Sequence, residues 1–334
     1  MKIILGTSVL FLALALGIEH LAAARAGSLE PRIEKLLELP AGSSVAALTL
    51  ASPELGAELV YVRAKGLWRS REAAGAVCDE ARIEALIAAC TQARGEELSR
   101  DPAREAHYGL DAPARLSIAL HGPKFLERDD RDVLASLEFG PGFARRAGAP
   151  EILAIDRDPR ALLASAAAGL PPFVDTRLLA GCFDEDFAGF RSIALEYADG
   201  RRFELTTQPP KSPEDPPEWT LTREGQSESA LVWRPGGYTS LWIRARAKGF
   251  ANPKQAPSLG LEHPFLRVTL VPTAGATIQM CVSERSIGNE FWLWNRRTNV
   301  LMRLDGGLFG DVTPGPTDFT DAARANPWER WLAR

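Results

Sequence analysis

The chain has 334 residues, of which 46% are apolar and 25% charged, and its formal net charge is −4. This balance excludes an intrinsically disordered chain, and the presence of only one long apolar run excludes a polytopic membrane protein. The mild acidity disfavours nucleic acid as a partner, because domains that bind nucleic acid carry a basic surface. The length is typical of two domains.

The chain begins with an apolar run, Ile3–Ile18, that follows Lys2. As a helix this run is about 24 Å long, and extension through Ala24 brings it close to the thickness of a bilayer core. Two interpretations stay open. Residues 1–27 are a single-pass anchor that contacts the lipid bilayer through residues 3–24, or a signal segment cleaved near Ala26. Either one places the rest of the chain outside the cytoplasm.

Residues 28–44 are predicted to form a linker with a short amphipathic helix. The first α+β repeat is predicted over residues 45–182. It begins with short strands at 47–50 and 59–62 and a third strand that starts at Trp68. A helix is expected to follow, with Asp79 as its cap and buried residues at Ile83, Leu86, Ile87 and Cys90. Strands are then expected at 116–120, 134–139 and 151–155, and a short helix at 159–168.

The second repeat, with a C-terminal tail, is predicted over residues 183–334. It opens with a hairpin around Asp199-Gly200, and Trp219 starts its next strand. A proline-rich loop, residues 209–217, interrupts the hairpins and is interpreted as a stiff exposed loop. Pro235-Gly236-Gly237 is expected to break the counterpart of the first repeat's helix, with helix resuming near 241–247. A last hairpin is expected over 291–304.

One motif occurs twice in the same register. Gly109-Leu110-Asp111-Ala112-Pro113 follows Trp68 at the same distance at which Gly260-Leu261-Glu262-His263-Pro264 follows Trp219. The repeated residues are therefore interpreted as structural landmarks: Trp68, Gly109, Leu110, Pro113, Trp219, Gly260, Leu261 and Pro264. The predicted fold class is α+β, with two tandem repeats of antiparallel sheet and packed helix behind an N-terminal membrane segment.

These landmarks, the helix from Asp79 and the hairpin at Phe190 resemble the domain-of-unknown-function 4340 family of bacterial proteins, over roughly residues 45–305. The resemblance implies an N-terminal membrane segment followed by one or two α+β repeats. Some members look like accessory proteins of gliding-type ABC transport systems, which implies an envelope protein as the class of partner. The resemblance implies no catalytic residue.

The sequence suggests no catalytic, cofactor or metal site. No histidine falls in a nucleophile motif, no phosphate-binding loop is present, and the acidic clusters at 129–132 and 184–186 lack the pattern of a calcium loop. The four cysteines (Cys78, Cys90, Cys182 and Cys281) have no CxxC spacing, and they are interpreted as small buried hydrophobes.

Tryptophan is concentrated in the last third of the chain. Trp292 and Trp294 are expected to face the same side of their hairpin, and together with Trp328 and Trp331 they form a possible partner surface. The alternative is a tryptophan-rich core of the second repeat.

These features favour a non-catalytic, membrane-tethered binding or accessory module outside the cytoplasm. Two alternatives remain. An exported hydrolase acting on envelope carbohydrate requires two carboxyl groups about 5–10 Å apart in a tryptophan-lined cleft. A structural spacer requires the absence of an exposed apolar patch.

Overall fold

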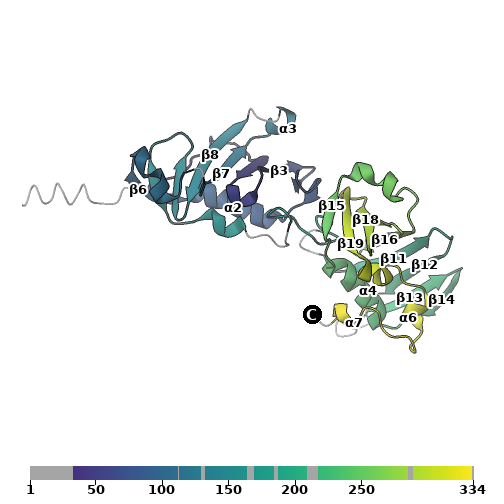
Figure 1. Cartoon of the computed structure of the whole chain (residues 1–334). Helices are drawn as coiled ribbons and strands as arrows, with labels where there is room; N and C mark the ends of the chain where they lie inside the picture. The colour runs from purple at the N-terminus through teal and green to yellow at the C-terminus, as the bar shows by residue number, and fades with distance from the viewer. Residues whose placement is uncertain are drawn as a thin grey trace, which may run out of the picture.

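The computed structural model describes residues 33–111, 113–128, 132–163, 169–183, 187–208, 217–284 and 289–332. The expected membrane segment, the acidic residues 129–131 and 184–186, and residues 209–216 of the proline-rich loop lie outside the described residues. Within the described ranges, no helix combines the length and apolar character that a bilayer crossing requires. Two antiparallel sheets account for most of these ranges, so strands outweigh helices (Figure 1).

The first sheet has ten strands in the order β1-β6-β10-β9-β8-β7-β2-β3-β4-β5. Alternate residues of its central strands, such as Leu48 on β2 and Ile118 on β7, are buried in one core with helix α2. The elements of this half are β1 (Ile33–Lys35), β2 (Ala47–Ala51), η1 (Pro53–Leu55), β3 (Leu59–Ala64), β4 (Leu67–Ser70), β5 (Ala76–Val77), α2 (Glu80–Gln92), β6 (Arg94–Ser99), η2 (Pro102–Tyr108), β7 (Leu116–His121), α3 (Phe125–Arg128), β8 (Val133–Gly140), β9 (Phe143–Arg146), β10 (Ile152–Ile155) and η3 (Pro159–Leu163).

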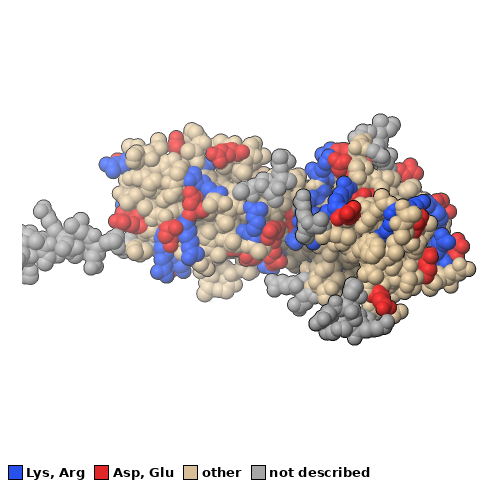
Figure 2. Space-filling model, turned by 90° about the horizontal axis from the view of Figure 1, so that it is seen from below, with Lys and Arg blue, Asp and Glu red and all other residues tan. Residues whose placement is uncertain are grey.

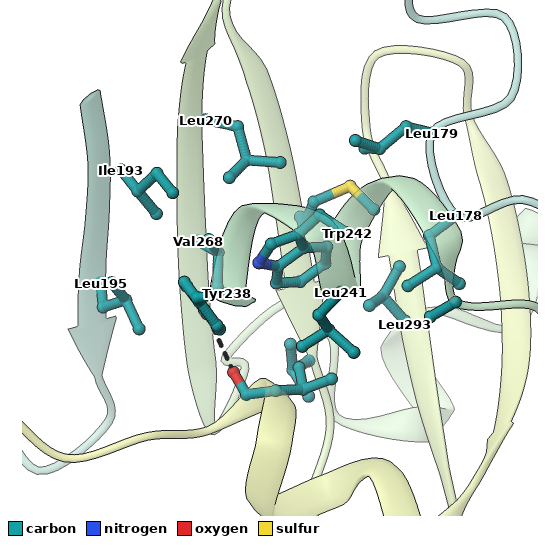
Figure 3. Close-up of a cluster of buried hydrophobic side chains, with 14 of the residues drawn as sticks. Leu178, Leu179, Ile193, Leu195, Tyr238, Leu241, Trp242, Val268, Leu270 and Leu293 are labelled. Atoms are coloured by element: carbon teal, nitrogen blue, oxygen red, sulfur yellow. Dashed lines mark hydrogen bonds between the residues drawn. The ribbon is translucent and has the colours of Figure 1, made fainter. Parts of the chain in front are cut away.

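The second sheet has nine strands in the order β14-β13-β12-β11-β16-β17-β18-β19-β15. Its core combines alternate residues of these strands with helix α4, and Figure 3 shows Trp242 of that helix close to Leu270 and Val268. The elements are β11 (Phe190–Tyr197), β12 (Arg202–Gln208), β13 (Glu218–Arg223), β14 (Gln226–Ser229), α4 (Trp233–Arg244), β15 (Gly249–Ala251), η4 (Pro253–Gln255), η5 (Pro257–Leu259), β16 (Leu266–Pro272), β17 (Ile278–Val282), β18 (Glu290–Asn295), β19 (Val300–Asp305), η6 (Gly306–Leu308), α5 (Phe309–Val312), α6 (Thr317–Thr320) and α7 (Glu329–Leu332).

The two sheets share one topology. Apart from β1, the first sheet runs β5-β4-β3-β2-β7-β8-β9-β10-β6, which matches the second sheet strand for strand in chain order. Helices α2 and α4 each follow the fourth strand of this series. The expected pair of antiparallel sheets with a packed helix is therefore present, and both follow the same chain path.

The prediction of a short amphipathic helix within residues 28–44 is wrong for residues 33–44, the part of this segment that the structure describes. Ile33–Lys35 form strand β1, which pairs antiparallel with β6, and Lys35 lies opposite Arg94. The second half repeats this contact as an isolated bridge between Arg177 and Arg246. A three-residue strand is defined by its distant partner rather than by its own pattern, which explains why the local sequence suggested a helix.

The same comparison shows which core the residues after each contact enter. Leu36 and Leu37 follow β1 into the first core, whereas Leu178 and Leu179 follow Arg177 into the second core. Residues 178–182 thus pack in the second core. The expected boundary between residues 182 and 183 stays a prediction, as do the others.

The expected break at Pro235-Gly236-Gly237 is also wrong, because α4 is continuous from Trp233 to Arg244. Pro235 lies in the first turn, where a backbone N–H has no intrahelical acceptor and proline therefore costs no hydrogen bond. Tyr238 and Trp242, one turn apart, are both fully buried. Their burial against the sheet compensates for the low helix propensity of the glycines.

The C-terminal segment (residues 309–332) packs against α4 and completes the second core. Trp328 is fully buried, stacks on Phe319 at 4.7 Å between ring centroids, and donates its indole N–H to the Asp311 carbonyl. Tyr238 of α4 donates to the Val312 carbonyl at 3.1 Å, the dashed line in Figure 3. The segment is therefore part of the fold of the second unit.

A buried arginine adds to this contact. Arg234 of α4 is 2% exposed, and its two Nη atoms donate at 2.5 Å to the carbonyls of Asp318 and Arg324. Gly237 permits the close approach, because a Cβ there would lie 2.6 Å from the Cβ of Trp328.

The two units meet along one junction. Phe250 packs against both cores, Val77 of the first sheet belongs to the second core, and Arg69 donates to the Thr298 carbonyl at 2.7 Å. On the face shown in Figure 2, basic and acidic residues are interspersed over both units.

We predict opposite effects for the two adjacent glycines of α4. Gly237→Ala should lower the free energy of unfolding by about 1–3 kcal/mol, because the added methyl group overlaps Trp328. Gly236→Ala should be neutral or raise it by up to about 1 kcal/mol, since no atom lies within 4 Å of the added Cβ and alanine favours helix. Denaturant unfolding of both variants tests this, and equal effects would contradict the assigned packing.

Candidate functional site

The repeated motif forms a corner that covers the outer face of each sheet. Gly109 and Gly260 end η2 and η5 with φ of 64° and 73°, and glycine adopts this left-handed conformation without strain. Leu110 and Leu261, the next residues, are fully buried in small clusters separate from the two main cores. Pro113 is exposed and Pro264 is buried, so the two corners differ at their last residue.

Trp68 and Trp219 occupy equivalent places in the two cores and are almost fully buried. The surroundings differ. The Trp68 indole donates to Glu84 of α2 at 3.0 Å, and Arg63 lies over its ring. Trp219 instead lines an apolar cleft beside α4. The eight landmarks thus build the scaffold, and two of them, Trp219 and Gly260, also line clefts described below.

A network of ion pairs connects η2, at the first corner, to strands β8 and β9 of its sheet. Arg145 on β9 binds Glu105 of η2 through two nitrogens, at 2.5 and 3.1 Å, and binds Glu138 on β8 at 2.5 Å. Arg115 adds a second contact to Glu138 at 2.8 Å. Hydrogen bonding from Arg145 lowers the pKa of Glu105 below its usual value. This network is structural and lies outside the clefts described below.

The four tryptophans expected at a partner surface separate into two groups. Trp292 and Trp294 point to the same side of β18, as predicted, but they are half-buried against the second corner, with Ala256 and Leu261. Trp328 is buried in the second core, so it is unavailable to a partner in this structure. Trp331 is half-buried and donates to Asp311.

One candidate site is a cleft of about 620 Å³ at one end of the second sheet, beside helix α4. We call it the α4 cleft. Its described lining comes from the ends of β11, β12, β13 and β16 and from one side of α4: Ala188, Gly189, Phe190, Arg191, Thr207, Gln208, Pro217, Trp219, Gly236, Thr239, Ile243 and Thr273. No carboxylate lies in this set. The sequence gives no local signal for this cleft, because its walls come from several separate stretches of chain.

A second cleft of about 500 Å³ lies at the second corner and brings His263, Glu284 and Trp292 together with two serines. The serine hydroxyls are not set up as nucleophiles. Ser258 donates to the Gln255 carbonyl, and Ser283 donates to the Glu284 carbonyl, both at 2.8 Å. Nucleophilic catalysis requires a base that accepts the hydroxyl proton.

The two other described histidines lie apart from this cleft. His107 is exposed beside Tyr108, whereas His121 is buried and its Nε2 lies 2.9 Å from the Thr49 hydroxyl. Burial lowers the pKa of His121. Across the described ranges, no three His, Cys, Asp or Glu residues gather in a way that would hold a metal ion.

All four cysteines are buried as free thiols. Burial raises the pKa of each, and it raises that of Cys90 to about 12. Asn295 donates to Cys182 at 3.1 Å and to the Leu178 carbonyl, so this thiol takes part in packing at the start of the second unit.

We predict that the folded protein hides all four thiols. At pH 8 a thiol-reactive dye should label none of them on the native full chain, because the reactive thiolate is buried and scarce. Four thiols should react in denaturant without reductant. Fewer than four would reveal a disulfide and contradict the structure.

We also predict that Glu105 contributes to the stability of the fold in a way that depends on pH. Its lowered pKa gives stability that is fully present above the unfolded pKa and is lost as the pH falls through the folded value. Glu105→Gln should therefore lower the melting temperature by about 2 °C at pH 7 and change it little at pH 3. Glu228→Gln, on the exposed edge strand β14, is the control. An equal loss at both pH values would contradict the ion pair.

Comparison with known proteins gives one match. The family model described as "Domain of unknown function (DUF4340)" matches residues 68–264. The chain matches no curated protein and no solved structure. The matched region runs from Trp68 to Pro264, that is, from the first landmark to the last. Because it covers more than half of the chain, the protein belongs to the domain-of-unknown-function 4340 family.

Proposed function

We propose that this chain is a non-catalytic, membrane-tethered binding or accessory module that acts outside the cytoplasm. Its partner would be another envelope protein, of the kind found in ABC-type transport or gliding-type complexes. The apolar run Ile3–Ile18 behind Lys2 supports the tether and its orientation. Cleavage near Ala26 would instead release a secreted or periplasmic form with the same binding surface.

One observation carries the binding role: the described lining of the α4 cleft exposes apolar surface and includes no carboxylate or histidine. Ile243 of α4 lines it and is 38% exposed, and Trp233 at the start of the same helix is 55% exposed. Exposed apolar surface around a cleft is typical of binding sites. A structural spacer would lack such a surface, so this observation favours the binding module over the spacer.

The hydrolase alternative receives less support from the described residues. A glycosidase needs a pair of carboxyl groups that flank the bond to be cleaved. The cleft lined by Trp219 includes no described carboxylate, and the cleft lined by Trp292 includes one, Glu284. Neither cleft provides the pair.

Site-specific photo-crosslinking in the native host tests the proposal. A photoreactive residue in place of Trp233, in the full chain, should capture an integral membrane transport subunit, because this apolar side chain is exposed at the start of the helix that lines the α4 cleft. The matched control replaces Gln226, which is exposed on the edge strand β14. Recovery of the chain in the cytoplasm, or equal crosslinking from both positions, would refute the proposal.

A further inference from the structure

The α4 cleft has the dimensions of a small-molecule site. Its volume of about 620 Å³ lies within the range of about 300–1,000 Å³ that ligand pockets occupy. Phe190 and Trp219 form its inner wall and are almost fully buried, whereas Ile243 at its edge is partly exposed. The cleft therefore has an apolar interior and an open rim.

The walls offer few hydrogen bonds to a ligand, although three threonines line them. Thr207 donates to the Gln208 carbonyl at 3.3 Å, Thr239 to the Gly236 carbonyl at 2.8 Å, and Thr273 to the Gly189 carbonyl at 3.2 Å. Each hydroxyl hydrogen is thus used by the main chain. A sugar or nucleotide would lose hydrogen bonds to water that these three threonines do not replace, because they have no free hydroxyl hydrogen to donate.

Where Gly236 lines the cleft, helix α4 has no side chain. Gly236 lies on the same side of α4 as Thr239 and Ile243, and a Cβ at Gly236 would meet no atom within 4 Å. Counted back from the equivalent bridges that follow the two helices, the matching residue of α2 is Glu84. No described residue fills the space beside Gly236, and any larger side chain at this position would occupy it.

Among the described residues that line the cleft, the ionisable charge is positive. Arg191 on β11 is the single ionisable residue in the described lining, and its side chain is exposed at the end of the strand. A guanidinium at the edge of an apolar cavity favours an anionic group there, because both partners keep contact with water while the apolar part of the ligand is buried.

We infer that the α4 cleft binds a single aliphatic chain with a carboxylate head, that is, a long-chain fatty acid. The aliphatic chain lies against Phe190, Trp219 and the bare surface at Gly236, and the carboxylate faces Arg191. No bond is made or broken. This ligand deepens the proposed binding role, but it requires neither the membrane tether nor a protein partner.

The test uses the full chain in lipid nanodiscs, with empty nanodiscs as the reference. Stearate brominated at its ninth and tenth carbons quenches tryptophan on contact, and its titration should give saturable quenching that is largely lost in Trp219→Phe. Unlabelled stearate should reverse it. Quenching that does not saturate, or that is the same in Trp219→Phe, would reflect partition into the lipid and would overturn the inference.

Two variants test the location and the head group. Gly236→Leu should weaken binding at least about tenfold by filling the cleft, with the melting temperature maintained. Gly310→Leu is the matched control, because Gly310 is also a helical glycine with nothing within 4 Å, and it lies outside the cleft. Arg191→Gln should remove a preference of about tenfold for the brominated acid over the brominated alcohol.

Each remaining outcome decides against the assignment. Unchanged binding by Gly236→Leu would show that the fatty acid binds outside the α4 cleft. Equal affinity of the unaltered chain for acid and alcohol would show that Arg191 does not bind the carboxylate. Displacement of the bromolipid by an apolar nonapeptide, but not by stearate, would identify a peptide site instead. None of these results depends on the crosslinking experiment, so failure of the ligand and failure of the protein partner are distinguishable.

Discussion

The main physical constraint on this protein is that each wide antiparallel sheet must be covered on both faces. In both units a helix that follows the fourth strand covers one face, and the glycine-ended corner covers part of the other. The first unit achieves this with α2 and η3. The second unit adds the C-terminal segment, and Trp328 becomes as deeply buried as any residue of the strands.

The glycines of α4 follow from this arrangement. Gly237 is required where Trp328 approaches the helix, and the neighbouring Gly236 leaves one side of the same helix uncovered. Two consecutive glycines of α4 therefore face different surroundings: Gly237 packs closely against Trp328, and Gly236 lines the open cleft. The first unit has Glu84 and Ala85 at the equivalent positions of α2, and Glu84 accepts a hydrogen bond from the Trp68 indole.

Local patterns predicted those parts of the fold that depend on short-range order. The spacing of Ile83, Leu86 and Ile87 predicted α2, and the equal distances from each tryptophan to its Gly-Leu corner predicted two related units. Local patterns did not predict β1 or the first part of α4, because the partner strand β6 and the contact with Trp328 decide them from far along the chain. They did not predict the α4 cleft for the same reason.

Exchange of backbone amides with deuterium, followed by mass spectrometry on the full chain, tests most directly whether the C-terminal segment completes the second unit. We predict that peptides from α4 and from residues 309–332 exchange slowly and become exposed together as denaturant is added, because each buries the other. Exchange of residues 309–332 at the rate of an unstructured chain, while α4 stays protected, would contradict this account.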